Sequence, residues 1–210
     1  MSSAITVLTA LGILAFALSG ALMAVRKRMD IVGLYVLAAI TAVGGGLLRD
    51  VLLDVPPTAL RTPWWWLLIG IAAAAVFYFQ GAIDRLRRAV LITDAVGLGI
   101  FCATSTTLAL SRGLGPFEAV VIGVTGGVAG GVLRDVLAGE IPSVLRRDTK
   151  LYALPAVFGC LLVVIGDEVG ARGDWLAVAA GAAIAVVRIL ALWRGWSAPA
   201  PRHHTPKAAR

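Results

Sequence analysis

Two pairs of arginine and aspartate stand behind glycine clusters in this chain of 210 residues. The stretch "GGGLLRD" ends in Arg49 and Asp50, and much further along the chain "GGVLRD" ends in Arg134 and Asp135. Both pairs lie in apolar runs, and a charged side chain inside a membrane is costly unless it faces a partner or a water-filled path. Neighbouring residues on a helix point about 100° apart, so we expect Arg49 to pair with Asp135 and Arg134 with Asp50. Such pairs would line a route for ions or polar solutes.

A second interpretation of the pairs gives them no functional role. An arginine near a helix end reaches the membrane surface through its flexible side chain, and the "VPP" after Asp54 places a helix end close to the first pair. Snorkelling, however, gives no reason for the same pair to recur behind the same glycines at opposite faces of a membrane. We therefore favour the water path.

The glycines before both pairs have two explanations of their own. Each glycine lowers helix stability by up to roughly 1 kcal/mol relative to alanine, so the clusters need a reason. Small residues let membrane helices approach closely, and glycines also permit a kink or break where the freed backbone faces protein or water. The candidate pore and hinge glycines are Gly44, Gly45, Gly46, Gly126, Gly127, Gly130 and Gly131.

A further apolar run, "TDAVGLGIFCATSTTLALS", carries one acid and a series of hydroxyls. A carboxylate near a helix start is favoured by the helix dipole alone, and hydroxyls can simply bond back to their own helix. If each arginine is neutralised by an aspartate of the other copy, Asp94 remains as the uncompensated acid and gives a weakly negative path with hydroxyl ligands. The candidate polar lining is Asp94, Thr104, Ser105 and Thr107.

The elements that position these residues are membrane-spanning helices. Hydrophobic residues make up 59% of the chain and charged residues 15%, which is more apolar surface than a soluble domain of this length can bury. A span needs about 20 mostly apolar residues, and the sequence predicts seven spans, of which the sixth is short and contains Pro155. The predicted spans are 4–25, 31–53, 64–83, 89–110, 117–138, 151–167 and 174–193.

The Lys and Arg residues between the spans predict the orientation. Thirteen lie in the first, third and fifth connections and the C-terminal tail, against three in the even connections. Cytoplasmic loops carry the excess of positive charge, so the N-terminus is predicted outside and the C-terminus in the cytoplasm. This bias explains the basic composition and leaves no need for a nucleic-acid partner, and Arg188 is expected to snorkel to the inner surface.

An internal repeat organises the chain. Residues 16–61 can be laid over 101–146 without a gap, and "GGLLRDVL" agrees with "GGVLRDVL" at seven of eight positions. Three spans per copy place the second copy in the membrane upside down, as in many transporters and some channels. The predicted units are a first three-helix repeat at 1–87, an inverted second at 88–170, a seventh helix at 171–196 and a disordered cytoplasmic tail at 197–210.

Enzymatic chemistry finds no support in the sequence. There is no nucleophile elbow, phosphate loop or set of metal ligands, and His203 and His204 lie in the tail. Cys102 and Cys160 lie within apolar runs and are expected to be packing residues. We therefore expect no catalytic residues, no cofactor and no resident metal, only transient monovalent cations.

The motifs together resemble the prokaryotic trimeric intracellular cation (TRIC) channels. The resemblance rests on the two glycine, arginine and aspartate motifs, on "FALSGALMA", "DAVGLGIF" and "GEIPSVLRRD", and it covers roughly residues 5–193. It implies a homotrimer with a potassium-permeable pore in each subunit, lined by helices that kink at the glycines. Two positions depart from the pattern: Thr9 stands where the first repeat often has an acid matching Asp94, and the second copy reads "AGG" at 129–131.

The function we expect is passive conduction of potassium or sodium ions across a bacterial or archaeal inner membrane by an all-α homotrimer surrounded by lipid. The alternative is a secondary carrier for a small neutral solute such as glycine, using the same helices to alternate access. A lipid-binding scaffold is a third interpretation, which the polar fourth span disfavours.

Overall fold

The computed structural model describes residues 3–79, 86–146, 151–171 and 173–196, and within them every regular element is an α-helix. The predicted tail with His203 and His204, and the end of the predicted third span, lie outside the described residues. The helices are α1 (Ser3–Arg26), α2 (Ile31–Leu52), α3 (Thr58–Arg61), α4 (Pro63–Phe79), α5 (Leu86–Ser111), α6 (Pro116–Leu137), α7 (Ala153–Glu168) and α8 (Asp174–Arg194).

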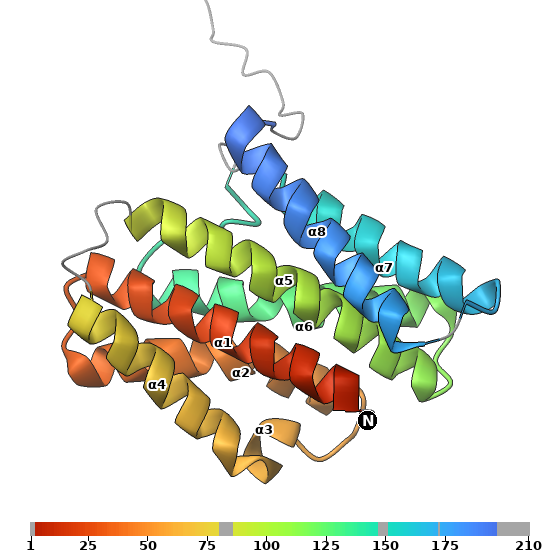
Figure 1. Ribbon diagram of the computed structural model, residues 1–210, viewed down its shortest axis with the longest axis horizontal. Helices are drawn as coiled ribbons and strands as arrows, with labels where there is room; N and C mark the ends of the chain where they lie inside the picture. The colour runs from red at the N-terminus through yellow and green to blue at the C-terminus, as the bar shows by residue number, and fades with distance from the viewer. Residues whose placement is uncertain (1–2, 80–85, 147–150, 172, 197–210) are drawn as a thin grey trace, which may run out of the picture.

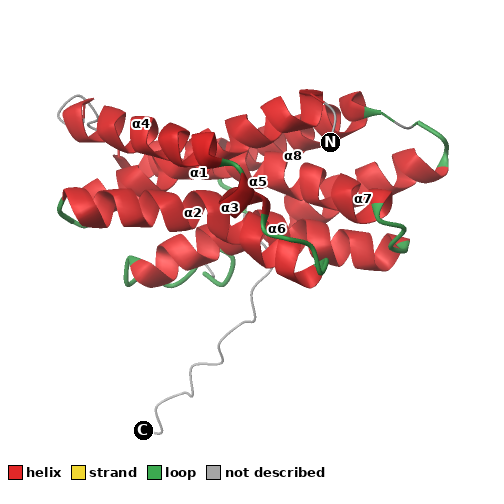
Figure 2. Cartoon of the chain, turned by 90° about the horizontal axis from the view of Figure 1, so that it is seen from below, coloured by secondary structure: helices red, strands yellow, loops and turns green. Residues whose placement is uncertain are grey.

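The helices form one bundle in which α1 and α5 lie side by side in the middle (Figure 1). On one side of this pair, α2 and α4 pack against α1. On the other side, α6 and α8 pack against α5, and α2 crosses α6. Figure 2 shows the loops gathered mainly at the ends of the helices. Phe16 of α1 and Phe101 of α5, which occupy equivalent positions in the two aligned copies, stack at the centre with ring centroids 5.3 Å apart.

The lengths of the helices and the apolar side chains on the surface of the bundle indicate a membrane protein. Five helices, α1, α2, α5, α6 and α8, are long and apolar enough to cross a membrane, and α4 is a shorter apolar helix of 17 residues. α7 has 16 residues, so the predicted count of seven spans stays a prediction. Large apolar side chains stand outward on several helices, such as Phe117 with 76% and Phe158 with 70% of its surface exposed. An all-α membrane protein is what the composition predicted.

α2 and α6 end in the same kind of turn. The amide of Val55 donates to the carbonyl of Asp50 (2.9 Å), and the amide of Glu140 donates to the carbonyl of Asp135 (2.8 Å). Each turn passes through one residue with positive φ, Asp54 at 50° and Gly139 at 67°, as helix ends of this type require. α3, the four-residue helix that follows the first of these turns, was not predicted.

The glycines of α2 and α6 mark the place where the two helices touch. A Cβ atom at Gly45 would meet the carbonyl oxygen of Gly126, and one at Gly130 would come within 2.5 Å of the carbonyl oxygen of Thr41. Both helices run through these glycines without interruption. Close packing therefore accounts for Gly45 and Gly130. The expectation of a helix break is wrong, because both helices continue through these glycines, whereas the expected kink stays a prediction.

Candidate functional site

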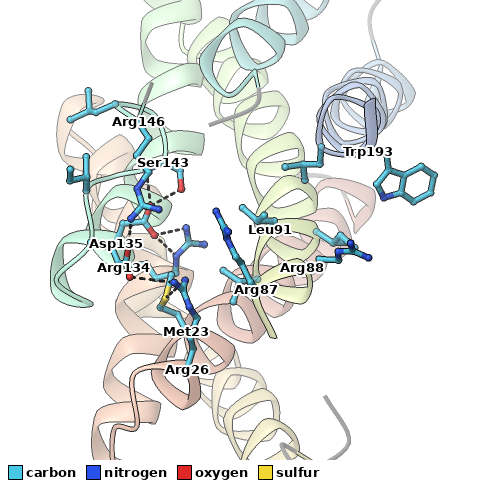
Figure 3. A pocket seen from close by; sticks show the side chains of 16 residues that line it. Met23, Arg26, Arg87, Arg88, Leu91, Arg134, Asp135, Ser143, Arg146 and Trp193 are labelled. Atoms are coloured by element: carbon cyan, nitrogen blue, oxygen red, sulfur yellow. Dashed lines mark hydrogen bonds and ion pairs between the residues drawn. The ribbon is translucent and has the colours of Figure 1, made fainter. Parts of the chain in front are cut away.

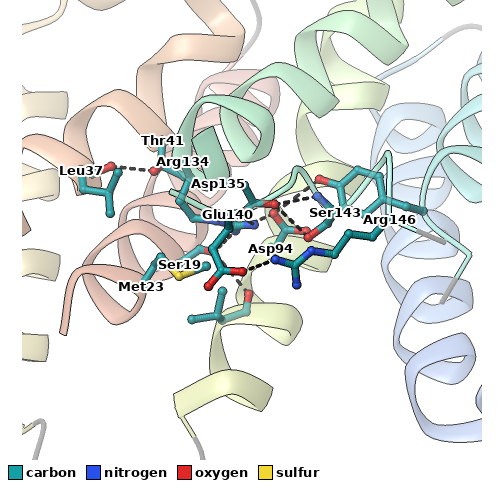
Figure 4. A network of polar contacts seen from close by, with 12 residues as sticks. Ser19, Met23, Leu37, Thr41, Asp94, Arg134, Asp135, Glu140, Ser143 and Arg146 are labelled. Carbon is teal, nitrogen blue, oxygen red and sulfur yellow. Dashed lines mark hydrogen bonds and ion pairs between the residues drawn. The ribbon is translucent and has the colours of Figure 1, made fainter. Parts of the chain in front are cut away.

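The second arginine and aspartate pair belongs to a buried cluster drawn from three helices (Figure 4). Arg134 of α6 donates from Nε and Nη2 to Asp135 Oδ1, at 2.9 and 2.7 Å. Its Nη1 donates to Asp94 Oδ1 of α5 at 2.7 Å and to Ser19 Oγ of α1 at 2.5 Å. All four residues are buried, so one guanidinium joins two carboxylates and a hydroxyl in the interior of the bundle.

Arg188 of α8 adds a second cation to this cluster. Its Nη2 lies 3.4 Å from Asp94 Oδ2, its Nη1 donates to the carbonyl of Leu151 at 3.1 Å, and its guanidinium lies 3.9 Å from the centre of the Tyr152 ring. The expectation that Arg188 snorkels is wrong: the side chain is fully buried, because α8 packs on α5 beside Asp94 and the acid compensates the charge inside. Two arginines and two aspartates leave the cluster neutral.

The first pair is a simpler copy of the second. Arg49 Nε and Nη2 donate to Asp50 Oδ1 at 2.8 and 2.6 Å. Asp50 Oδ2 accepts the amide of Thr58 at 2.7 Å, as Asp135 Oδ2 accepts the amide of Ser143 at 2.7 Å. In each copy one carboxylate therefore holds both its neighbouring arginine and the loop that follows the helix.

The predicted pairing of Arg49 with Asp135 and of Arg134 with Asp50 is wrong. Each arginine instead folds back onto the aspartate that follows it, since the long side chain spans the angle between adjacent positions. α2 and α6 cross near Gly45 and Gly130, so the two pairs lie on opposite sides of the crossing point. Asp94, expected as the uncompensated acid, is bound by Arg134 and Arg188.

The two halves differ at the position of the second acid. The alignment of the two copies, extended toward the N-terminus, places Thr9 opposite Asp94, and the Thr9 hydroxyl donates to the carbonyl of Ile5 at 2.8 Å. Within the described residues, Nη1 of Arg49 is buried without a hydrogen-bond partner, whereas Nη1 of Arg134 has two. With threonine at position 9, where the second copy has Asp94, Arg49 has a single carboxylate partner among the described residues.

The hydroxyls of α5 are turned mostly toward their own helix. Thr104 donates to the carbonyl of Ile100 at 2.8 Å and Thr107 to that of Ala103 at 2.9 Å. Ser105 Oγ is buried with no hydrogen-bond partner among the described residues, next to the backbone of Gly126. The structure thus brings Asp94 into the charged cluster and does not bring the hydroxyl series there.

A cavity of about 990 Å³ opens beside the cluster, with Arg134 and Asp135 in its wall (Figure 3). Its other charged lining residues are Arg26 at the end of α1, Arg87 and Arg88 at the start of α5, and Glu140 and Arg146 in the loop after α6. We call the end of the bundle that carries these residues the basic end. Sequence reasoning missed this cavity because its walls come from helices far apart in the chain.

Glu140 is the acid at the rim of the cavity. Its Oε1 lies 2.7 Å from Lys27 Nζ and 3.4 Å from Arg26 Nη2, and its Oε2 contacts Arg146 Nη2. The hydrogen bond from Lys27 and then that from Arg146 lower the pKa of this carboxyl to about 2. Glu140 is therefore ionised throughout the neutral and mildly acidic range and loses its charge only as the pH falls toward that pKa.

Fold and site together define a polytopic membrane protein with compensated charges in its interior. A family model described as "Glycine transporter" matches residues 6–81 and 91–168. A membrane protein of Deinococcus radiodurans is 44% identical over 152 residues, 71% of this chain and 70% of that protein. The inner membrane protein YadS of Escherichia coli K12 is 39% identical over 150 residues, 70% of this chain and 72% of that protein.

Among solved structures, the trimeric intracellular cation channel orthologue from Rhodobacter sphaeroides is similar with a TM-score of 0.86 and 36% identity, over 92% of this chain and 100% of that one. The chain belongs to the prokaryotic TRIC channel family. The structural relatives are described as channels, which agrees with the expectation of a protein that is not an enzyme.

Proposed function

We propose that this protein conducts monovalent cations, potassium among them, across the bacterial inner membrane through a pore in each subunit of a homotrimer. The observation that carries the proposal is that Arg134 and Asp135, buried in an apolar bundle, stand in the wall of a 990 Å³ cavity. Charged groups inside a membrane are typical of ion and solute pathways. The similarity to the cation channel orthologue from Rhodobacter sphaeroides and to the inner membrane protein YadS supports the same proposal.

The proposed path leads from the cavity past the cluster of Arg134, Asp94 and Asp135 and on toward Arg49 and Asp50. Because each arginine is compensated by an acid, a passing cation meets carboxylate oxygens without a net positive barrier. Asp94 remains the proposed inner ligand, and Thr104, Ser105 and Thr107 the proposed lining beyond it. Gly44, Gly46, Gly126, Gly127 and Gly131 remain proposed lining positions of the same path.

The path runs between two proposed inverted repeats, residues 1–87 and 88–170, with 171–196 as an additional helix. The contacts of Asp50 with Arg49 and Thr58, repeated by Asp135 with Arg134 and Ser143, support this division. The two separate segments matched by the family model support it as well.

The proposal is tested with purified protein in a planar bilayer. In potassium chloride we expect unitary current steps whose reversal potential follows the potassium gradient. A silent bilayer, together with saturable glycine uptake into liposomes, would instead establish the carrier that the family model's description names.

We expect the basic end to face the cytoplasm, because it carries Arg26, Arg87, Arg88 and Arg146. A membrane-impermeant thiol reagent added to intact cells should label Pro56→Cys, in the loop after α2, and leave Arg87→Cys unlabelled. Both positions are exposed, and the native Cys102 and Cys160 are buried and compete little. Labelling of Arg87→Cys alone would reverse the orientation.

We expect three subunits in the assembly, in line with the description of the trimeric relative. Stripes of small residues permit such close packing of helices between subunits. Chemical crosslinking in mild detergent should give a ladder that stops at three. A ladder that ends at two would contradict the trimer and favour a dimeric carrier.

A further inference from the structure

The basic end presents a problem for a protein proposed to pass cations. Arg26, Arg87, Arg88 and Arg146 line the mouth of the cavity, and four positive charges lower the local concentration of cations at an entrance. Arg134 and Asp135, deeper in the cavity, compensate one another. Within the described residues that line the mouth, Glu140 supplies the carboxylate that opposes the four arginines.

The backbone of Glu140 takes part in the turn that ends α6. Its amide closes the turn at the end of α6, where Gly139 takes the positive φ of 67°. Asp135, which accepts that amide through its carbonyl, also fixes the next part of the loop through Ser143, whose amide and hydroxyl both donate to Asp135 Oδ2. The carboxylate therefore projects from a braced turn.

The side chain of Glu140 gathers cations from both halves of the chain. Lys27 and Arg26 reach it from the end of α1, and Arg146 reaches it from the loop after α6. These contacts draw Arg26 and Arg146 toward the rim, where a compact ion cluster presents less positive charge than three separate side chains do. Glu140 lines the mouth of the cavity, so its charge acts on ions that enter there.

The opposite end of the bundle has the same turn without the acid. In the alignment of the two copies, Val55 lies opposite Glu140 and Arg61 lies opposite Arg146. Val55 closes the turn after α2 through the same backbone hydrogen bond that Glu140 makes after α6. Since the turn forms with valine, its geometry does not require a carboxylate. The carboxylate of Glu140 is therefore explained by the positive charges around it at the basic end and not by the turn.

We propose that Glu140 is a specificity-determining residue of the cation path, which holds Arg26, Lys27 and Arg146 at the rim and makes the basic end permissive to cations. The inference rests on the proposed channel function. It concerns entry at one end of the path, so it predicts an effect that depends on the direction of the current.

The test is Glu140→Gln in a planar bilayer at about 0.1 M potassium chloride. At this salt concentration the Debye length is about 10 Å, so loss of one unit charge about 6 Å from the ion changes its local concentration about twofold in water. Cation current entering from the basic end should therefore fall about twofold. Current in the other direction should fall less. At about 1 M salt, where the Debye length is only about 3 Å, the rectification should disappear.

Two further variants separate local charge from general damage. Glu140→Gln combined with Arg146→Gln removes one charge of each sign and should restore most of the current. Glu118→Gln removes an exposed acid at the other end, in the first turn of α6, and should not reduce current entering from the basic end. An unchanged current–voltage curve for Glu140→Gln at low salt, or rectification that persists at high salt, would overturn the proposal.

A second measurement does not depend on conduction. A cysteine at the exposed, cavity-lining Leu145 reports the local potential through its relative rates of reaction with cationic and anionic thiol reagents. The cation-to-anion ratio should fall about fourfold when Glu140→Gln is added, because the rate with the cationic reagent falls and the rate with the anionic reagent rises by about twofold each. An unchanged ratio would overturn the role of Glu140. A silent wild-type protein with a changed ratio would overturn the channel and retain the electrostatic role.

Discussion

Replacing Arg134 with methionine is expected to lower the free energy of unfolding by about 3–5 kcal/mol, the usual cost of removing one partner of a buried ion pair. The change leaves Asp94 and Asp135 with Arg188 as the remaining arginine of the cluster, and it removes four hydrogen bonds. The measurement is the thermal midpoint for loss of the folded species in detergent. Arg88→Met, at an exposed position, is the matched control and should change little.

A second substitution distinguishes lost charge balance from lost packing. Asp135→Asn on the Arg134→Met background removes the acid that lost its arginine and leaves Arg188 with Asp94, so part of the stability should return. The double-mutant cycle should then show a coupling energy of about 0.5 kcal/mol or more between the two positions, as residues in one ion-pair network do. Strict additivity of the two changes would contradict the cluster as described.

Gly45→Ala is expected to disturb normal assembly of the bundle, with a loss of stability of at least about 1–3 kcal/mol, the usual cost of overpacking. Its Cβ would meet the carbonyl oxygen of Gly126 and lie 3.2 Å from the carbonyl carbon, and backbone cannot move aside as a side chain can. Gly46→Ala is the matched control, because there the closest atom is a ring carbon of Phe101 at an ordinary 3.5 Å. It should be neutral or stabilising, since alanine favours the helix.

The two glycine variants are compared by thermal unfolding and by size-exclusion profile in the same detergent. If Gly46→Ala proved as harmful as Gly45→Ala, the glycines would be needed for flexibility along α2 rather than for its contact with α6. That result would bring back the hinge interpretation for this helix.

Helix positions were predictable from the sequence because apolar runs of the right length leave few other solutions in a membrane. The predicted spans 4–25 and 31–53 correspond to α1 at Ser3–Arg26 and α2 at Ile31–Leu52. α3 was missed because four residues make no periodic pattern. The membership of Asp94 in a polar span was foreseen, but its partners were not.

The partners of the charged residues depend on distances that spacing does not encode. Repeat symmetry suggested exchange of partners between Arg49 and Arg134, while the reach of an arginine side chain favoured the adjacent aspartate. Arg188 looked like a helix-end residue in the sequence, and only the packing of α8 on α5 reveals its acid. Glu140 belonged to a motif that the sequence showed, and its three cations come from the end of α1 and from the loop after α6.

One carboxylate in each half binds both a buried arginine and a surface loop, so the loop is linked to the interior of the bundle. Asp135 compensates Arg134 with one oxygen and ties Ser143 with the other, and Asp50 does the same for Arg49 and Thr58. Displacement of either loop would therefore break a hydrogen bond of the carboxylate that compensates a buried arginine. The conformation of the surface loops and the charge balance in the interior are therefore coupled through a single side chain in each half.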